Sequence, residues 1–227
     1  MNLTRRLHAQ RGFSFIEIIV VMGIISILAG LSVVVVQMMA KKGPKMKTGL
    51  LLNRVSTSVE AWKGKFGAYP PSEVGKIFLV TNLPTTKISR LPNLNNQGIR
   101  SLYICLNLTA FGKAVELNNE DLTPEEEMDD ALDRPVEGLT SPKLWEIVDA
   151  YRNPLVYINS MDYLSYDKNP PTYIAKDAEG QPRPVNPKPW KSGKTEAFEQ
   201  ARSYQLFSMG EDGTPNTDDD LKSWTTD

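Results

Sequence analysis

The sequence predicts an α+β protein in which a long N-terminal helix, membrane-spanning in its first half, packs on a small antiparallel sheet. Three features of the 227 residues lead to this prediction: an apolar segment at 13–36, apolar side chains at helical spacing up to residue 66, and short β-type segments in the last third. About 160 residues follow the helix, which is the size of one domain.

The apolar segment at residues 13–36 contains 24 residues, and its polar side chains are Ser14, Glu17, Ser26 and Ser32. About 20 helical residues cross a hydrocarbon core of about 30 Å. A cleaved secretory signal has a shorter apolar region and ends in small residues, whereas Met38 and Met39 follow this one. We therefore expect a transmembrane helix at 13–36.

Glu17 is out of place in such a helix. A charge at mid-membrane costs about 2.5 to 3.5 kcal/mol and requires a partner, and no Lys or Arg occurs between Phe13 and Gln37. A plain membrane anchor does not explain this carboxylate.

The N-terminal segment resembles type IV prepilins and the pseudopilins of type II secretion. The resemblance rests on a basic leader, a Gly-aromatic junction and an acid five residues into the mature chain: Arg5, Arg6, His8, Arg11, Gly12, Phe13 and Glu17. It implies that a prepilin peptidase removes the leader 1–12 by cutting after Gly12 and methylates Phe13. The Phe13 amine of one subunit would then pair with Glu17 of its neighbour.

The basic residues around the span do not fix its orientation, because Arg5, Arg6 and Arg11 precede it and four lysines follow it between 41 and 47. The resemblance implies a cytoplasmic leader. We therefore expect a single-pass protein of the inner membrane whose C-terminal domain is periplasmic.

The helix is expected to continue through residues 37–67, because Leu51, Val55, Val59, Trp62 and Phe66 recur at spacings of three and four. We interpret this stripe as the face that packs on the chain's own domain, with a groove for a separate partner as the alternative. Gly67 and Pro70-Pro71 predict the end of the helix. The Gly67 to Pro71 segment is similar to the turn that ends this helix in major pseudopilins.

The composition disfavours several functional classes. The only histidine, His8, lies in the leader. The mature chain therefore has no histidine to act as a general base, which argues against most hydrolase mechanisms. Cys105 is the only cysteine, so no intramolecular disulfide can form, and its apolar neighbours predict a buried, inert thiol. Many type IV pilins close a C-terminal loop with a disulfide, so this favours the pseudopilins. The net charge without the leader is near −4, and we expect no nucleic-acid partner.

Residues 76–148 form an insert that we cannot assign to the resembled family and expect to be partly helical. A helical face occurs around Ile99 to Leu106, and Thr123-Pro124 and Ser141-Pro142 predict two helix starts. We interpret the acidic run 125–130 as a solvated helix start rather than a metal site.

The globular domain is expected at 68–227, with strands at 155–158, 173–175 and 203–207 and a surface loop at 177–195. Residues 149–157 resemble the segment that enters the sheet in major pseudopilins. In that comparison Tyr151 replaces Trp and Arg152 replaces Gly.

An acidic loop follows the last strand within 203–224, and its carboxylates and glycines suit calcium, which takes about 6 to 8 oxygen ligands. The spacing does not match the helical calcium loop, but it is similar to the C-terminal calcium loop of major pseudopilins. The expected ligands are the carboxylates of Asp212, Asp218 and Asp220, with Asp219, the Asn216 side chain and the Met209 carbonyl as additions. The alternative is a solvated acidic tail.

The resemblance implies a non-enzymatic subunit of a type II secretion pseudopilus with a pilin-like fold. Its expected partners are further copies of itself, other pseudopilins, the prepilin peptidase, and the inner-membrane assembly platform with its ATPase. A type IV pilus or minor pilin subunit is the first alternative. The second is a membrane-anchored periplasmic enzyme or calcium-dependent binding module.

Overall fold

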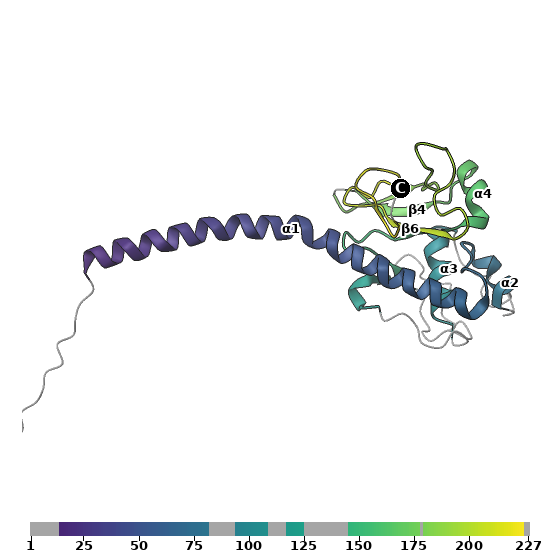
Figure 1. Ribbon diagram of the computed structural model, residues 1–227, viewed down its shortest axis with the longest axis horizontal. Helices are drawn as coiled ribbons and strands as arrows, with labels where there is room; N and C mark the ends of the chain where they lie inside the picture. The colour runs from purple at the N-terminus through teal and green to yellow at the C-terminus, as the bar shows by residue number, and fades with distance from the viewer. Residues whose placement is uncertain (1–13, 82–93, 109–116, 125–144, 178, 225–227) are drawn as a thin grey trace, which may run out of the picture. The chain divides into compact units, whose positions relative to one another are not determined.

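The computed structural model describes residues 14–81, 94–108, 117–124, 145–177 and 179–224. It separates into two compact units, residues 1–43 and 44–227, and each is described by itself. The α+β class is confirmed: an N-terminal helix is followed by short helices and small antiparallel sheets (Figure 1).

The first unit contains the beginning of helix α1, which extends over Phe15–Phe66. Ser14 precedes it and accepts the N–H groups of Glu17 and Ile18 at 3.0 and 3.2 Å. The described apolar side chains between Phe15 and Leu28 are exposed. Within the described part of the chain, no helix has the length and hydropathy of a membrane span. The side chains of residues 31–41 lie outside that description.

The second unit begins inside α1, which continues through Pro44 and ends at Phe66. Gly67 follows with a φ of 77° and donates its N–H to the Lys63 carbonyl at 2.8 Å. Such a left-handed residue directly after the last turn suits glycine and ends the helix. The predicted helix end is therefore confirmed.

The helical stripe of the sequence is the core face of this second part of α1. Leu51, Val55, Val59 and Trp62 are at most 3% exposed, and Phe66 packs against the same core. The stripe therefore packs on the chain's own domain, as expected.

In the described residues, short helices and seven strands follow α1. The helical elements are η1 (Val74–Lys76), α2 (Ile77–Thr81), α3 (Gln97–Leu106), η3 (Asn119–Asp121), η4 (Ser160–Asp162) and α4 (Tyr163–Lys168). The strands are β1 (Leu122–Pro124), β2 (Trp145–Ile147), β3 (Val156–Asn159), β4 (Tyr173–Lys176), β5 (Pro182–Val185), β6 (Tyr204–Ser208) and β7 (Leu221–Lys222).

The strands form three small antiparallel sheets in the described residues, where one was expected. β6 lies between β3 and β7, β1 pairs with β2, and β4 pairs with β5. The predicted strands at 155–158, 173–175 and 203–207 correspond to β3, β4 and β6 within one residue at each end. β5 lies in the segment that was predicted to be a surface loop.

Two predicted helix starts are not borne out. Thr123-Pro124 ends strand β1 and pairs with Trp145 and Glu146 of β2. The residues after Ser141-Pro142 that were expected to be helical form β2 instead. Proline signals are local, whereas the pairing of these segments is decided by a contact between distant parts of the chain. The acidic run 125–130 lies outside the described residues.

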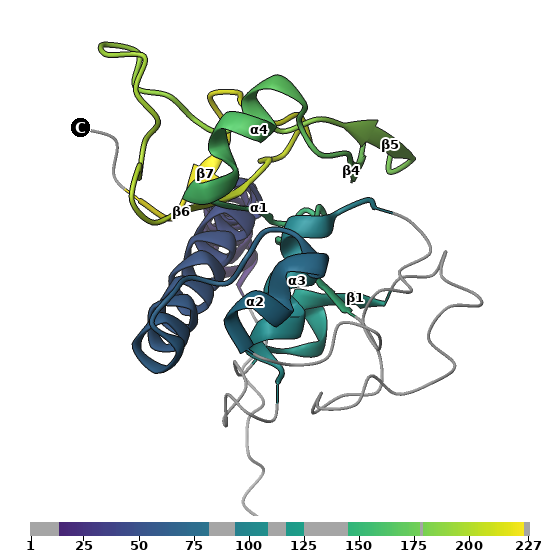
Figure 2. The same ribbon diagram turned by 90° about the vertical axis from the view of Figure 1, so that its right-hand side faces the viewer.

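Helix α3 lies at the centre of the second unit, between α2 and β1 (Figure 2), and contacts both β2 and β3. Its predicted helical face is confirmed, and burial extends to Ile104 and Cys105. The buried Arg100 donates to the carboxylate of Glu146 on β2 at 2.8 Å, and the Asn96 amide binds both oxygens of that carboxylate. Because each charge is paired and hydrogen-bonded, the polar group joins α3 to β2 inside the core.

Candidate functional site

The first candidate feature is the start of α1. Glu17 is exposed, and its Oε2 accepts the N–H of Ser14 at 3.3 Å. A carboxylate in the first turn of a helix satisfies a free N–H group and interacts favourably with the helix dipole. The predicted cleavage residues Gly12 and Phe13 lie outside the described residues.

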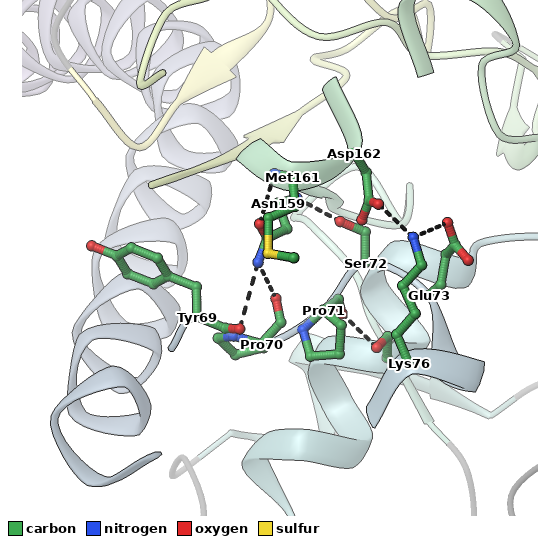
Figure 3. Close-up of polar contacts among 10 residues, drawn as sticks. Tyr69, Pro70, Pro71, Ser72, Glu73, Lys76, Asn159, Met161 and Asp162 are labelled. Atoms are coloured by element: carbon green, nitrogen blue, oxygen red, sulfur yellow. Dashed lines mark hydrogen bonds and ion pairs between the residues drawn. The ribbon is translucent and has the colours of Figure 1, made fainter. Parts of the chain in front are cut away.

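The second feature is the segment that follows α1, residues 67–76. Side chains from other elements form hydrogen bonds and ion pairs with this segment (Figure 3). The Pro70 carbonyl accepts from the hydroxyl of Tyr157 at 2.7 Å and from the side-chain amide of Asn159 at 2.9 Å. The N–H of Asn159 donates to the Ser72 hydroxyl at 2.5 Å. Prolines have no N–H to donate to a backbone ladder. The side chains of Tyr157 and Asn159 on β3 therefore provide the hydrogen bonds to this segment.

The same segment is tied to two further elements. Ser101 of α3 donates its hydroxyl to the Pro71 carbonyl at 2.5 Å. Lys76 contacts the carboxylates of Glu73 and Asp162, each at 2.7 Å, and Asp162 is almost fully buried. The end of α1 is thus fixed to α3, β3 and η4 together.

The third feature is the acidic loop, residues 209–220, between β6 and β7. Gly210, Gly213 and Asn216 adopt φ values of 66°, 62° and 66°. Left-handed residues at three positions give the chain a tight path that glycine and asparagine tolerate best. A Cβ at Gly210 would collide with the carboxylate of Asp219, so this close approach requires glycine.

Asp219 lies inside the acidic loop as its main hydrogen-bond acceptor. Its Oδ2 accepts the N–H groups of Glu211 and Asp212 at 2.8 and 3.3 Å, and its Oδ1 accepts the Thr217 hydroxyl at 2.6 Å. Burial acts to raise its pKa, but these hydrogen bonds outweigh burial and hold the pKa of Asp219 below its ordinary value.

Asp220 has the opposite electrostatic character. Its carboxylate accepts the N–H of Asn216 at 2.9 Å and lies 3.3 Å from the Thr217 hydroxyl. Burial nonetheless raises the pKa of Asp220 to about 7, opposed by these hydrogen bonds. The pKa values of these two neighbouring carboxyl groups are therefore shifted in opposite directions.

The remaining predicted calcium ligands are spread over the loop. Asp212 accepts the N–H of Thr214 at 2.6 Å, Asn216 accepts from and donates to the backbone of Lys188, and Asp218 lines a cavity with Trp190 and Trp224. Met209 is fully buried.

The donor types of the acidic loop suit calcium, which prefers oxygen ligands. The positions of these side chains fit a calcium site less well than their chemistry does. Among the predicted ligands, only the Asp219 and Asp220 carboxylates converge on one atom, the Thr217 hydroxyl oxygen. Within the described residues, no group of three or more His, Cys, Asp or Glu side chains is placed to hold a metal ion. Calcium binding stays a prediction.

A turn at residues 149–153 supports the start of the acidic loop. Asp149 accepts the N–H groups of Tyr151 and Asn153, each at 2.9 Å, and the hydroxyl of Ser208 at 2.5 Å. Arg152 closes the turn with a φ of 69°. A left-handed residue that carries a side chain is strained, so this position favours glycine.

The Asp149 carboxyl is almost fully buried. Burial raises its pKa to about 6, although the hydrogen bonds from Ser208, Asn153 and Tyr151 act to lower it. Sequence reasoning treated Asp149 and Asn153 only as parts of a family resemblance. The signal that could have marked them is an Asp followed four residues later by Asn-Pro, a pattern typical of side-chain-capped turns.

Cys105 is fully buried, as predicted, and burial raises the pKa of its thiol far above the ordinary value. A protonated thiol without access to solvent is a poor nucleophile. The prediction of a buried thiol is confirmed.

A family model described as the prokaryotic N-terminal methylation motif matches residues 7–33. The matched region contains the predicted cleavage junction, Glu17 and most of the apolar segment. No curated protein and no solved structure showed significant similarity to the chain.

The match defines a class. The chain carries a prepilin-like leader, which is typical of membrane-anchored, pilin-type structural subunits. Such a leader implies processing by a prepilin peptidase and assembly into pilin-type filaments.

Proposed function

We propose that this protein is a structural subunit of a type II secretion pseudopilus. The observation that carries the proposal is the methylation motif at 7–33. The peptidase would cut after Gly12 and methylate Phe13, and residues 13–36 would anchor the subunit in the inner membrane with its domain in the periplasm. Filament growth by the assembly platform and its ATPase would push folded proteins outwards.

The role of Glu17 follows from its charge. In the subunit its carboxylate has only a backbone N–H within the described contacts at the helix start. A carboxylate and an amine each lose hydration in a membrane, and pairing between subunits offsets both losses. The pair forms only in the assembled state, so it favours filaments with the correct register over single subunits.

The pseudopilus is favoured over a type IV pilus by the buried, single Cys105, which cannot close the disulfide loop of many pilins. A pilus or minor pilin subunit would instead place the chain in fibres at the cell surface. The location of the filaments, confined to the envelope or extending from the surface, separates the two functions.

The test uses the full chain expressed with a prepilin peptidase and an assembly platform. Mass spectrometry of the processed N-terminus is expected to show loss of residues 1–12 and one added methyl group on Phe13. Glu17→Ala is expected to be processed like the wild type but to give few filaments. Glu179→Ala, at an exposed carboxylate of the globular domain, is the matched control and is expected to assemble normally. Wild-type filament yield from Glu17→Ala, alone and mixed with wild-type subunits, would remove the proposed role of Glu17.

We also propose that the acidic loop binds calcium. Asp219 and Asp220 lie together on Thr217, and Asp220 is partly buried with a pKa near 7, so a bound cation would stabilise its ionised form. Asp212 and Asp218 would complete the ligand set, with Asn216 and the Met209 carbonyl as additions. Binding only to the folded state would stabilise it by about 2.7 kcal/mol at a calcium concentration 100 times the Kd.

The calcium test compares melting of the full chain in detergent with calcium, with magnesium and with a chelator. Calcium is expected to raise the Tm of the wild type and to have little effect on Asp220→Asn. Asp177→Asn, which alters an aspartate outside the acidic loop, is the control and is expected to keep the calcium response. A wild-type Tm that is the same in calcium and chelator would show that the loop is a solvated acidic segment.

A further inference from the structure

The turn at residues 149–153 contacts three parts of the second unit that are far apart in sequence. One contact reaches the end of β6, directly before the acidic loop, one reaches the end of β4, and one reaches α1. The contacts are made by the side chains of Asp149 and Asn153 and by the backbone of Ala150. Side chains rather than backbone ladders therefore connect these elements.

Asn153 joins the turn to β4 and to the acidic loop. It is 1% exposed, its Oδ1 accepts the N–H of Lys176 at 2.8 Å, and its Nδ2 lies 3.5 Å from the Gly210 carbonyl. Gly213 packs directly on it, because a Cβ at Gly213 would lie 3.1 Å from Nδ2 and would collide with the Lys176 carbonyl. The acidic loop therefore rests on the amide of Asn153.

Asp149 provides a second connection to the same loop. Its Oδ2 accepts the hydroxyl of Ser208, and the Ser208 oxygen in turn accepts the N–H of Gly210 at 3.1 Å. All these groups are buried. When one group in such a buried hydrogen-bond network moves, its neighbour is left without a hydrogen-bond partner. The groups of the network are therefore expected to move together.

The turn reaches α1 through Ala150, whose N–H donates to the Thr48 hydroxyl at 3.2 Å. Thr48 is fully buried and lies in the part of α1 that belongs to the second unit. The contacts thus run without a break from Gly210 and Gly213, through the turn, to α1.

We propose that the 149–153 turn is a coupling element, through which order in the acidic loop controls the packing of the turn against Thr48 of α1. Asn153 and Asp149 are its positioning residues. The coupling does not depend on calcium: any change that loosens the loop, whether a substitution or the loss of a bound ion, removes the support of both side chains. The turn then opens at Ala150.

Hydrogen exchange of the full chain in detergent, without calcium, tests this coupling. Gly213→Ala disturbs the loop through a left-handed backbone and a collision with the Lys176 carbonyl, and its Cβ also crowds the Asn153 amide of the turn. It is expected to speed exchange in the peptide covering 149–153 by about tenfold, the effect of losing one net hydrogen bond. Gly180→Ala is the matched control, because Gly180 has a φ of 78° and open space around it in the β4–β5 turn, and it is expected to leave that peptide unchanged.

A second variant covers the case in which Gly213→Ala does not fold. Asp219→Asn weakens the hydrogen bonds to Glu211, Asp212 and Thr217, which lie within the loop and not in the turn, and it is expected to speed exchange at 149–153 in the same way. Faster exchange confined to residues 209–220, with 149–153 as slow as in the wild type, would overturn the coupling.

A calcium arm separates this inference from the calcium proposal. If calcium protects the loop, the coupling predicts parallel protection of 149–153, and protection of the loop alone would contradict it. If calcium changes no exchange rate, the calcium proposal fails. The exchange rates of the loop variants in calcium-free buffer still show whether the loop and the turn are coupled.

Discussion

The two parts of α1 carry similar apolar side chains in very different surroundings. Those described between Phe15 and Leu28 are 49 to 78% exposed, whereas Leu51, Leu52, Val55, Val59 and Trp62 are at most 3% exposed. Burial is therefore decided by what the rest of the chain places against the helix, and not by the residue types. The first part leaves a large apolar surface that the described contacts do not cover, which is typical of surfaces that meet a membrane or a partner.

The largest expected effect comes from one substitution made in both parts of the helix. Leu52→Ala removes a side chain that is 1% exposed and is expected to lower the free energy of unfolding by about 2 to 5 kcal/mol. Leu28→Ala, at a side chain that is 58% exposed, is expected to change it by about 0.5 kcal/mol or less. Urea unfolding of the full chain in detergent measures both, and equal losses would contradict the contrast between the two parts.

The second prediction concerns Asp149, whose turn contacts the second part of α1. Its pKa rises from 3.8 in the unfolded chain to about 6 in the folded protein, so the folded state holds the proton more tightly. The contribution of Asp149 to stability is therefore greatest below pH 4, falls as the pH rises from 4 to 6, and is lost above that range. The rise in pKa corresponds to about 3 kcal/mol.

Asp149→Asn keeps the shape of the side chain but cannot ionise. In calcium-free buffer, its stability relative to the wild type is expected to improve by up to about 3 kcal/mol between pH 4 and pH 7. Asp177→Asn is the control, because Asp177 accepts N–H groups from its own turn at an exposed site. A difference between Asp149→Asn and the wild type that stays constant with pH would show that the buried carboxyl does not titrate in this range.

The second part of α1 was predictable from the sequence because its partners impose a regular pattern. A helix face that packs on one core repeats every three to four residues, and Gly67 marks its end chemically. Strands β3, β4 and β6 were recognisable for a related reason, since they are continuous β-type segments.

Strands β1, β2 and β5 were missed because their sequences contain helix or loop signals that pairing overrides. In the turn between β4 and β5, the N–H of Asp177 donates to the Gln181 carbonyl. In the register of this pair, Pro182 and Pro184 therefore lie at positions between hydrogen-bonded pairs. Two prolines are tolerated there because no ladder donor is required of them. Similarly, Pro124 ends β1, where sequence reasoning expected a helix to begin.

The candidate site was only partly accessible from the sequence. The leader is a contiguous motif, and the family match at residues 7–33 supports it, whereas the role of Glu17 stays a proposal. The roles of Asn153 and Asp149 depend on loops that meet 57 and 59 residues further along the chain, and no local pattern encodes such a meeting. The sequence likewise shows how many carboxylates the acidic loop contains, but it does not show how their side chains are oriented.

The smallest expected effect tests how the end of the buried part of α1 is fixed. Tyr157→Phe removes the hydroxyl that donates to the Pro70 carbonyl, while the Asn159 amide still donates to the same oxygen. Because that carbonyl keeps one partner, the loss is expected to be about 1 kcal/mol. Tyr204→Phe, which removes a longer contact of 3.5 Å to the Ser56 carbonyl, is the matched control and is expected to cost less.

Removing both donors to Pro70 sharpens this prediction. In the double variant Tyr157→Phe, Asn159→Ala, the Pro70 carbonyl is left inside the protein without its two observed donors, which adds the cost of an unsatisfied buried acceptor. The double variant is therefore expected to lose about 1 kcal/mol more than the sum of the two single variants. Additive losses in urea unfolding would mean that water reaches this carbonyl, and that the two side chains stabilise the end of α1 independently.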